Sequence, residues 1–100
     1  MLKFSDPWEI PVNSEALENQ FSGELDTSHY LYKFRNCVKA IAKRSDCDDV
    51  LFEIREMGYV LVHLTWSKQN SSKYPLYKVF PREVDVQIII DEEHASFIGY

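Results

Sequence analysis

The chain lacks several features from which function is commonly inferred. It has three glycines and two cysteines in 100 residues, and no apolar run long enough to span a membrane. The glycines form no phosphate-binding loop, and Cys37 and Cys47 have neither CxxC spacing nor histidines placed for a zinc site. The first seven residues lack the apolar core of a signal peptide. We therefore expect a cytoplasmic protein with free thiols, no metal and no cofactor.

An excess of acidic side chains argues against nucleic acid as a partner. The chain carries 11 basic and 16 acidic residues, so its formal charge of −5 repels phosphate backbones on average. One basic cluster lies beside aromatic residues, an arrangement that can bind a single strand. It consists of Lys33, Arg35, Lys39, Lys43 and Arg44 with Tyr30, Tyr32 and Phe34. Acidic segments flank the cluster, so we interpret it as a solvated face and expect neither nucleic acid nor a membrane as partner.

The densest apolar segment, residues 48–66, predicts a β-hairpin in the middle of a sheet. Val50, Phe52 and Ile54 alternate with other side chains, and the same period of two runs from Val60 to Trp66. Residues 57–58 separate the two runs, and a glycine at position 58 tolerates the positive φ of a tight turn. The two strands are therefore expected to be antiparallel neighbours.

The remaining elements predict one α+β domain over residues 1–100. Two prolines around Trp8 favour an extended arm over residues 1–12 that packs through this tryptophan. Asn13 is placed to cap a helix that ends near residue 25, and strands are expected at 29–34, 37–44 and 76–80. The alanines and lysines of 37–44 also suit a helix. Residues 82–93 favour a C-terminal helix, although 84–90 alternates as a strand would. The sheet is predicted to be an antiparallel meander of four to five strands.

Asp46, Asp48 and Asp49 form the one short acidic cluster beside a predicted strand. If this loop folded back toward His63, the side chains could hold a divalent metal or act as a general acid and base. Aspartates also bond readily to nearby backbone, which is the more common use of such a cluster. His63 is interpreted either as a histidine hydrogen-bonded to a neighbour or as a contact in a binding surface. No nucleophile, base and acid occur in a known order, so we expect no enzyme.

Four segments carry a resemblance to a known group of proteins. They are KAIAKR at 39–44, DDVLFE at 48–53, VHLTWS at 62–67 and YP at 74–75. This succession resembles the "AIAR…DDVLFE…VVHLTWS…P" core of small bacterial proteins that are similar to immunity proteins of polymorphic and contact-dependent growth-inhibition toxin systems. The sequence departs from that pattern at residues 59–61, at Lys73 and at both ends.

The resemblance implies a stoichiometric inhibitor of a cognate toxin C-terminal domain. An acidic domain can occlude a basic nuclease by placing carboxylates where the substrate phosphates would lie. The expected electrostatic contacts are Asp46, Asp48, Asp49, Asp91, Glu92 and Glu93, and the expected aromatic anchors are Trp66, Tyr74 and Tyr77. Two alternatives remain. One is a metal-dependent hydrolase or nucleotide-processing enzyme using Asp48, Asp49 and His63, and the other is a subunit that assembles through a sheet edge.

Overall fold

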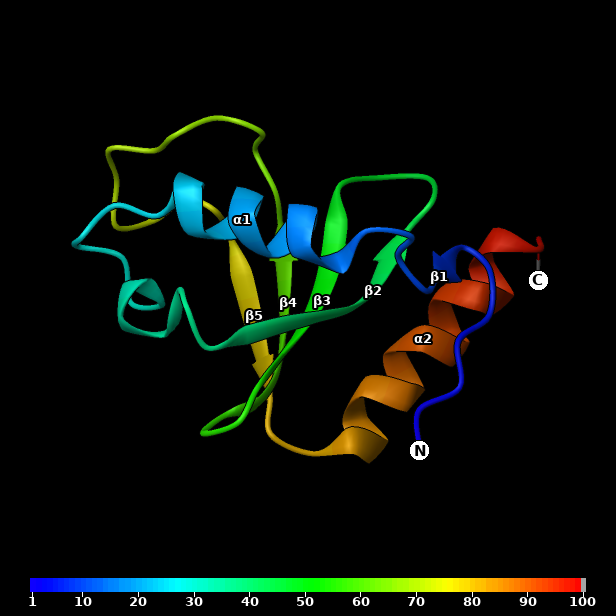
Figure 1. Ribbon diagram of the computed structural model, residues 1–100. Helices are drawn as coiled ribbons and strands as arrows, with labels where there is room; N and C mark the ends of the chain where they lie inside the picture. Colours follow the sequence, from blue (N-terminus) through cyan, green and yellow to red (C-terminus); the bar gives the residue numbers. More distant parts are fainter. Residues whose placement is uncertain (100) are drawn as a thin grey trace.

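A five-stranded antiparallel sheet organises the molecule. The computed structural model describes residues 1–99, and its sheet has the order β1-β2-β3-β4-β5, so each strand pairs with its neighbour in sequence (Figure 1). The elements are β1 (Trp8–Glu9), α1 (Ser14–Glu24), the 3₁₀ helix η1 (Tyr32–Phe34), β2 (Val38–Arg44), β3 (Asp49–Ile54), β4 (Gly58–His63), β5 (Tyr77–Phe80) and α2 (Glu83–Phe97). The predicted α+β class, with a helix at each end of a meander, is confirmed. Within residues 1–99, neither helix is both long and apolar enough to cross a membrane.

The predicted hairpin forms the centre of the sheet. β3 and β4 pair from Asp49 opposite His63 to Ile54 opposite Gly58, and β3 is the middle strand. The Met57 amide donates to the Ile54 carbonyl over 3.0 Å and Gly58 has a φ of 99°. The turn therefore occupies residues 55–57 rather than the predicted 57–58, and Gly58 is the first residue of β4, opposite Ile54. β4 also ends at His63 rather than continuing to Trp66.

Each face of the sheet has its own core, as the alternation in β3 requires. Val50, Phe52 and Ile54 face α1, where Phe21 lies 4.7 Å from Phe52 between ring centroids. Leu51, on the other face, packs with α2 and the N-terminal arm. The first core contains Leu17, Phe21, Leu25, Leu31, Ala40, Val50, Phe52, Ile54, Val60, Val62 and Leu64. The second contains Trp8, Ala42, Leu51, Val86 and Ile90. The N-terminal arm thus packs against the rest of the domain through its buried Trp8, as predicted.

A bulge in β2 explains why residues 37–44 read ambiguously. Ala40 pairs with Phe52, but Ala42 pairs with Leu51, so Ile41 is an extra residue. Ala40 belongs to the core beneath α1, whereas Ile41 and Ala42 both pack in the core beneath α2. A bulge interrupts the period of two, and small alanines fit where the backbone bends. The strand prediction is confirmed, and the bulge explains why residues 37–44 do not alternate regularly between apolar and polar side chains.

The strand predicted over residues 29–34 is wrong. Residues 27–31 form turns and Tyr32–Phe34 is a 3₁₀ helix. His29 organises the segment: its Nδ1 accepts a hydrogen bond from the Leu31 amide at 3.0 Å, and its Nε2 lies 3.0 Å from the Pro75 carbonyl. Because Nδ1 is an acceptor, Nε2 carries the proton and donates to Pro75. The buried imidazole thus bonds to backbone groups within this segment and at Pro75, whereas a strand would bond to a neighbouring strand. The alternation of aromatic residues does not mark a strand here, and Leu31 is buried within the turns.

The C-terminal segment is a helix, as favoured by its proline and acidic start. α2 begins at Glu83, carries Asp85 in its first turn, and extends four residues past the predicted end. Arg82, just before the helix, forms an ion pair with Asp85 at 2.9 Å. The rival strand fails because Val86 and Ile90, four residues apart, are the buried positions. At the other end, Asn13 accepts from the Ala16 amide and caps α1 as predicted.

Gly58 provides a test of the central hairpin. A Cβ at this position would lie 2.7 Å from the Pro81 carbonyl oxygen, and the residue also has a positive φ. We predict that Gly58→Ala lowers the free energy of unfolding by about 2–4 kcal/mol, because it adds backbone strain to a steric clash. Urea denaturation measures the difference. Gly23→Ala is the matched control, since nothing lies within 4 Å of its Cβ in α1, and it should stabilise by about 0.5–1 kcal/mol. Similar effects of both changes would contradict this account.

Candidate functional site

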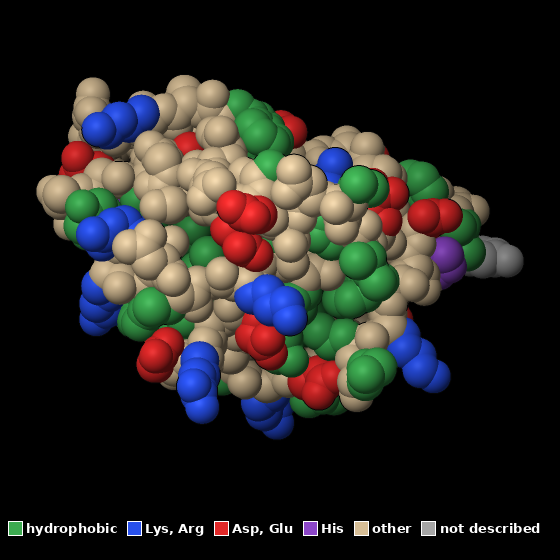
Figure 2. All heavy atoms as spheres, in the orientation of Figure 1, with side chains coloured by type: hydrophobic (Ala, Val, Ile, Leu, Met, Phe, Trp, Pro, Cys, Tyr) green, Lys and Arg blue, Asp and Glu red, His purple; other side chains and the backbone are tan. Residues whose placement is uncertain are grey.

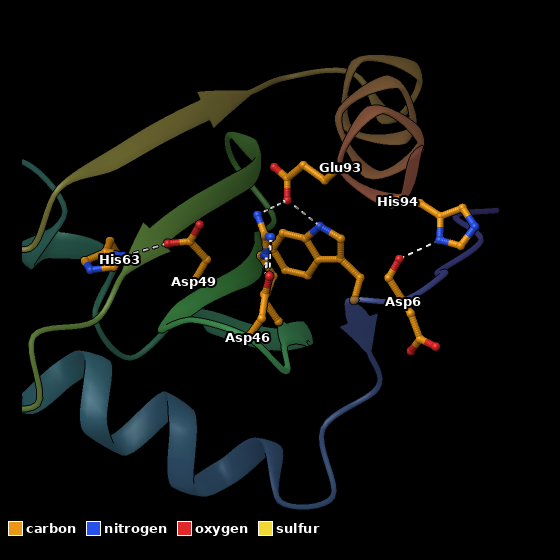
Figure 3. A network of polar contacts seen from close by, with 8 residues as sticks. Asp6, Asp46, Asp49, His63, Glu93 and His94 are labelled. Atoms are coloured by element: carbon orange, nitrogen blue, oxygen red, sulfur yellow. Dashed lines mark hydrogen bonds and ion pairs between the residues drawn. The ribbon is translucent and has the colours of Figure 1, made fainter. Parts of the chain in front are cut away.

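Several of the predicted contact residues meet at one end of the sheet. Asp46 and Asp48 lie in the loop between β2 and β3, Asp49 begins β3, and Glu93 reaches this region from α2. Figure 3 shows Glu93 and Asp46 on opposite sides of a shared set of polar contacts, with Asp49 to one side beside His63. We call these four carboxylates the acidic end of the sheet. Their geometry separates them into two pairs with different roles.

Asp46 and Glu93 share Arg44 and are used by the fold. The Arg44 guanidinium donates to both Asp46 oxygens, at 2.8 and 2.7 Å, and to Glu93 at 2.6 Å. The Trp8 indole donates to the same Glu93 oxygen at 2.9 Å. This network connects the N-terminal arm, β2 and α2. The hydrogen bond from Arg44 lowers the pKa of Asp46, and the same bond raises the pKa of Arg44.

Asp48 holds an exposed tryptophan. Its Oδ1 accepts a hydrogen bond from the Trp66 indole at 2.9 Å, and its backbone carbonyl accepts from the Leu64 amide at 3.1 Å. Trp66 is 54% exposed and has a φ of 60°. The indole therefore lies at the surface beside a carboxylate. Its backbone has a conformation that residues other than glycine seldom adopt.

Asp49 and His63 are cross-strand partners at the open end of the hairpin. The His63 Nδ1 donates to the Asp49 carboxylate over 2.8 Å, and the His63 side chain is 54% exposed. The pair borders a hollow of about 340 Å³ that is lined also by Leu61, Leu76, Tyr77 and Lys78. His63 is therefore bonded to a neighbour, as one interpretation required, but it lies at the surface. A carboxylate that orients an imidazole is also found at general bases, yet among the described hydrogen bonds none joins His63 to a serine, threonine or cysteine.

The other predicted contact residues lie apart from these bonds. Tyr77 is half-buried and stacks on Tyr30 with a centroid distance of 6.1 Å, so one ring face is covered. Tyr74 is exposed, with the Lys73 ammonium 5.4 Å from its ring centroid. Asp91 accepts from Gln87 on α2, and its neighbour Glu92 is exposed. Within the described chain, no hydrogen bond connects Tyr74, Asp91 or Glu92 to the acidic end of the sheet.

Glu24, the last residue of α1, was not predicted to matter. Its side chain is fully buried, and Oε1 accepts from the Thr65 amide at 2.8 Å and the Thr65 hydroxyl at 2.6 Å. Oε2 accepts from the Trp66 amide at 2.9 Å and from Gln20 at 2.8 Å. One signal was present in the sequence: Leu17, Phe21 and Glu24 follow helical spacing, which puts a carboxylate on the apolar stripe. Glu24 fixes the backbone that presents Trp66.

The alternative sites receive no geometric support. Across residues 1–99, no three His, Cys, Asp or Glu side chains are grouped so that they could hold a metal ion. Asp49 bonds to His63 whereas Asp48 bonds to Trp66, so two of the three residues of the hydrolase alternative form a pair and the third is bonded elsewhere. In the basic cluster, Arg35 stacks 3.9 Å above the Tyr32 ring centroid, which occupies a ring face that a base would need. Figure 2 shows charges of both signs interspersed over the face that carries α1.

Comparisons with known proteins add no relative. No protein-family model matches the chain, and neither the curated proteins nor the solved structures contain a match.

The lowered pKa of Asp46 predicts a pH effect on stability. Because the folded pKa lies below the ordinary value of 3.8, Asp46 stabilises the protein above that value and ceases to do so as pH falls through the folded pKa. We expect Asp46→Asn to lower the urea midpoint at pH 6 and the two midpoints to converge in acid. In an Arg44→Met background the substitution should have little effect at either pH. An equal difference at pH 6 and at pH values below the folded pKa would contradict the linkage.

Proposed function

We propose that this protein is an immunity protein, which binds a cognate bacterial toxin domain and neutralises it by stoichiometric occlusion. The observation that carries the proposal is the state of Asp48 and Asp49. Among residues 1–99, the recorded ion pairs give neither residue a lysine or arginine partner, whereas Asp46 and Glu93 share Arg44. Two carboxylates that are adjacent in sequence, exposed Asp48 and partly exposed Asp49, thus lack a lysine or arginine partner at a site that also presents Trp66.

The same carboxylates are fixed in place before any partner arrives. Asp49 is held by its place in β3 and by His63, and Asp48 by the Leu64 amide and the Trp66 indole. Such preorganisation reduces the entropy lost on binding. Complementary charge also speeds encounter with a basic surface and rejects acidic ones. Both effects suit an inhibitor that must capture a toxin quickly.

Occlusion follows from the chemistry of the surface. A nuclease binds phosphates with lysine and arginine side chains, and carboxylates can occupy the same cationic site. The net charge of −5 extends the attraction beyond the contact itself. Asp91 and Glu92 are the exposed carboxylates of α2 that would enlarge the contact if the partner reaches the helix. Occlusion of this kind needs no chemical step by this chain and no cofactor.

The direct experiment is a calorimetric titration, at moderate salt, of this protein with the toxin domain that is encoded next to its gene. Binding with one-to-one stoichiometry, together with loss of toxin activity at equivalence, is the expected result. No heat at micromolar concentrations and undiminished toxin activity would overturn the proposal.

A pair of charge reversals tests which end of the sheet is used. Asp49 begins β3, and Glu56 lies exposed in the turn at the opposite end of the same hairpin. We predict that Asp49→Lys weakens toxin binding about tenfold or more and reduces its salt dependence, because it removes a negative charge and adds a repulsive one. Glu56→Lys changes the net charge equally and should leave the affinity within about twofold. Equal losses would indicate only long-range attraction, and no loss from Asp49→Lys would exclude this surface.

A further inference from the structure

Trp66 is held at the surface on a strained backbone. It is the one residue other than glycine with positive φ among residues 1–99. An indole that is 54% exposed gains little from burial, and the positive φ is strained for a bulky side chain. Glycine or asparagine would adopt this backbone with less strain. Backbone conformation and burial therefore do not account for a tryptophan at this position.

The constraint on Trp66 comes from the buried Glu24 carboxylate. Glu24 accepts the amides of Thr65 and Trp66 and the Thr65 hydroxyl, and its backbone carbonyl accepts the Gln69 amide at 3.0 Å. No ion pair is recorded for this carboxylate within the described chain, although burying a charge without a cation is costly. It also lies at the C-terminal end of α1, where the helix dipole disfavours an anion. Several hydrogen bonds to Glu24 thus fix the loop that follows β4, although the end of α1 is an unfavourable position for this buried negative charge.

Trp66 is 54% exposed, and among residues 1–99 no aromatic ring, lysine or arginine lies against its indole ring. The Nε1 edge points to the Asp48 carboxylate over 2.9 Å. Tryptophan is the best aromatic residue for binding a cation over its ring face. A cation placed there would also meet the nearby negative charge of Asp48, so the ring and the carboxylate attract the same group. A nucleobase could stack on the ring, but its phosphates would then approach Asp48 and Asp49.

We propose that Trp66 is a preformed anchor that receives an arginine or lysine side chain of a protein partner on its indole face, with Asp48 as the adjoining counter-ion and Glu24 as the positioning residue. The inference rests on the proposed function, since it assumes that the partner is a basic protein. It adds the atoms that recognise the partner and explains why strain is retained at this residue.

The first test uses a tetra-arginine peptide and the two indole N–H resonances of the chain. Trp66 is exposed, whereas Trp8 is buried with its indole bonded to Glu93, so Trp8 is an internal control. Titration should shift the Trp66 indole resonance and leave that of Trp8 in place. Tetra-glutamate and oligothymidylate are the control probes. Equal shifts of both indoles by tetra-arginine, no shift, or a larger Trp66 shift with oligothymidylate would each overturn the proposal.

The second test separates binding from folding. Trp66→Gly removes the ring and relieves the positive φ, so its melting temperature should be no lower than that of the wild type. Its affinity for the toxin domain should fall about 30-fold or more, as for a central anchor. Phe97→Ala is the matched control, because Phe97 is 49% exposed at the end of α2 and is not among the proposed contact residues, so this variant should bind normally. If the wild type binds the toxin and Trp66→Gly binds as tightly, the anchor is refuted while the immunity function stands.

The role of Glu24 is tested by a double-mutant cycle with the peptide. Glu24→Gln should weaken the response to tetra-arginine in the wild-type background but not further in the Trp66→Gly background, where amide resonances near Asp48 report binding. A residue that only stabilised the fold would lower binding equally in both backgrounds, and that result would remove Glu24 from the proposal. If the toxin does not bind but the peptide shifts Trp66 selectively, the anchor stands and the partner is a different basic protein.

Discussion

The register of the β3–β4 hairpin is the constraint on which the rest of the structure depends. It places Val50, Phe52 and Ile54 against α1 and Leu51 toward α2, so one strand supplies both cores. The same register sets Asp49 opposite His63 at the end of the hairpin. A slip of one residue would exchange the two faces and separate this polar pair. The same register therefore determines both the packing of the two cores and the position of the acidic end of the sheet.

Local patterns were enough to predict the elements that obey a regular period. The hairpin, α1 and α2 all bury residues at the spacing that the sequence displays, and the predicted α+β meander follows from them. The failures occur where a single long-range contact replaces periodicity. Residues 29–34 form turns because buried His29 bonds to Pro75, and no local pattern in the sequence indicates a partner 46 positions away. The β2 bulge at Ile41 was hidden for the same reason, since a bulge is defined by the opposite strand.

The candidate site was predicted in composition but not in organisation. The sequence pointed to Asp46, Asp48, Asp49 and Glu93 as equivalent carboxylates, yet the structure commits Asp46 and Glu93 to Arg44 and leaves Asp48 and Asp49 without such a cation within the described chain. This division depends on Arg44 and Trp8 meeting α2, a contact between distant segments. Local sequence can count charges, but their availability depends on tertiary pairing.

The Arg44 network and the Glu24 cluster use buried or half-buried charge for opposite purposes. Arg44 balances its two carboxylates and attaches the arm to α2, so its gain is structural. Glu24 satisfies its oxygens only with neutral donors and holds a strained tryptophan, and the fold gains little from where that ring is placed. Strain that persists because its surroundings over-determine it is typical of residues whose exposed geometry matters. The contrast supports Trp66 and Asp48 as the contact residues that we propose, by a criterion independent of net charge, because the same number of carboxylates could have been displayed without the buried anion or the positive φ.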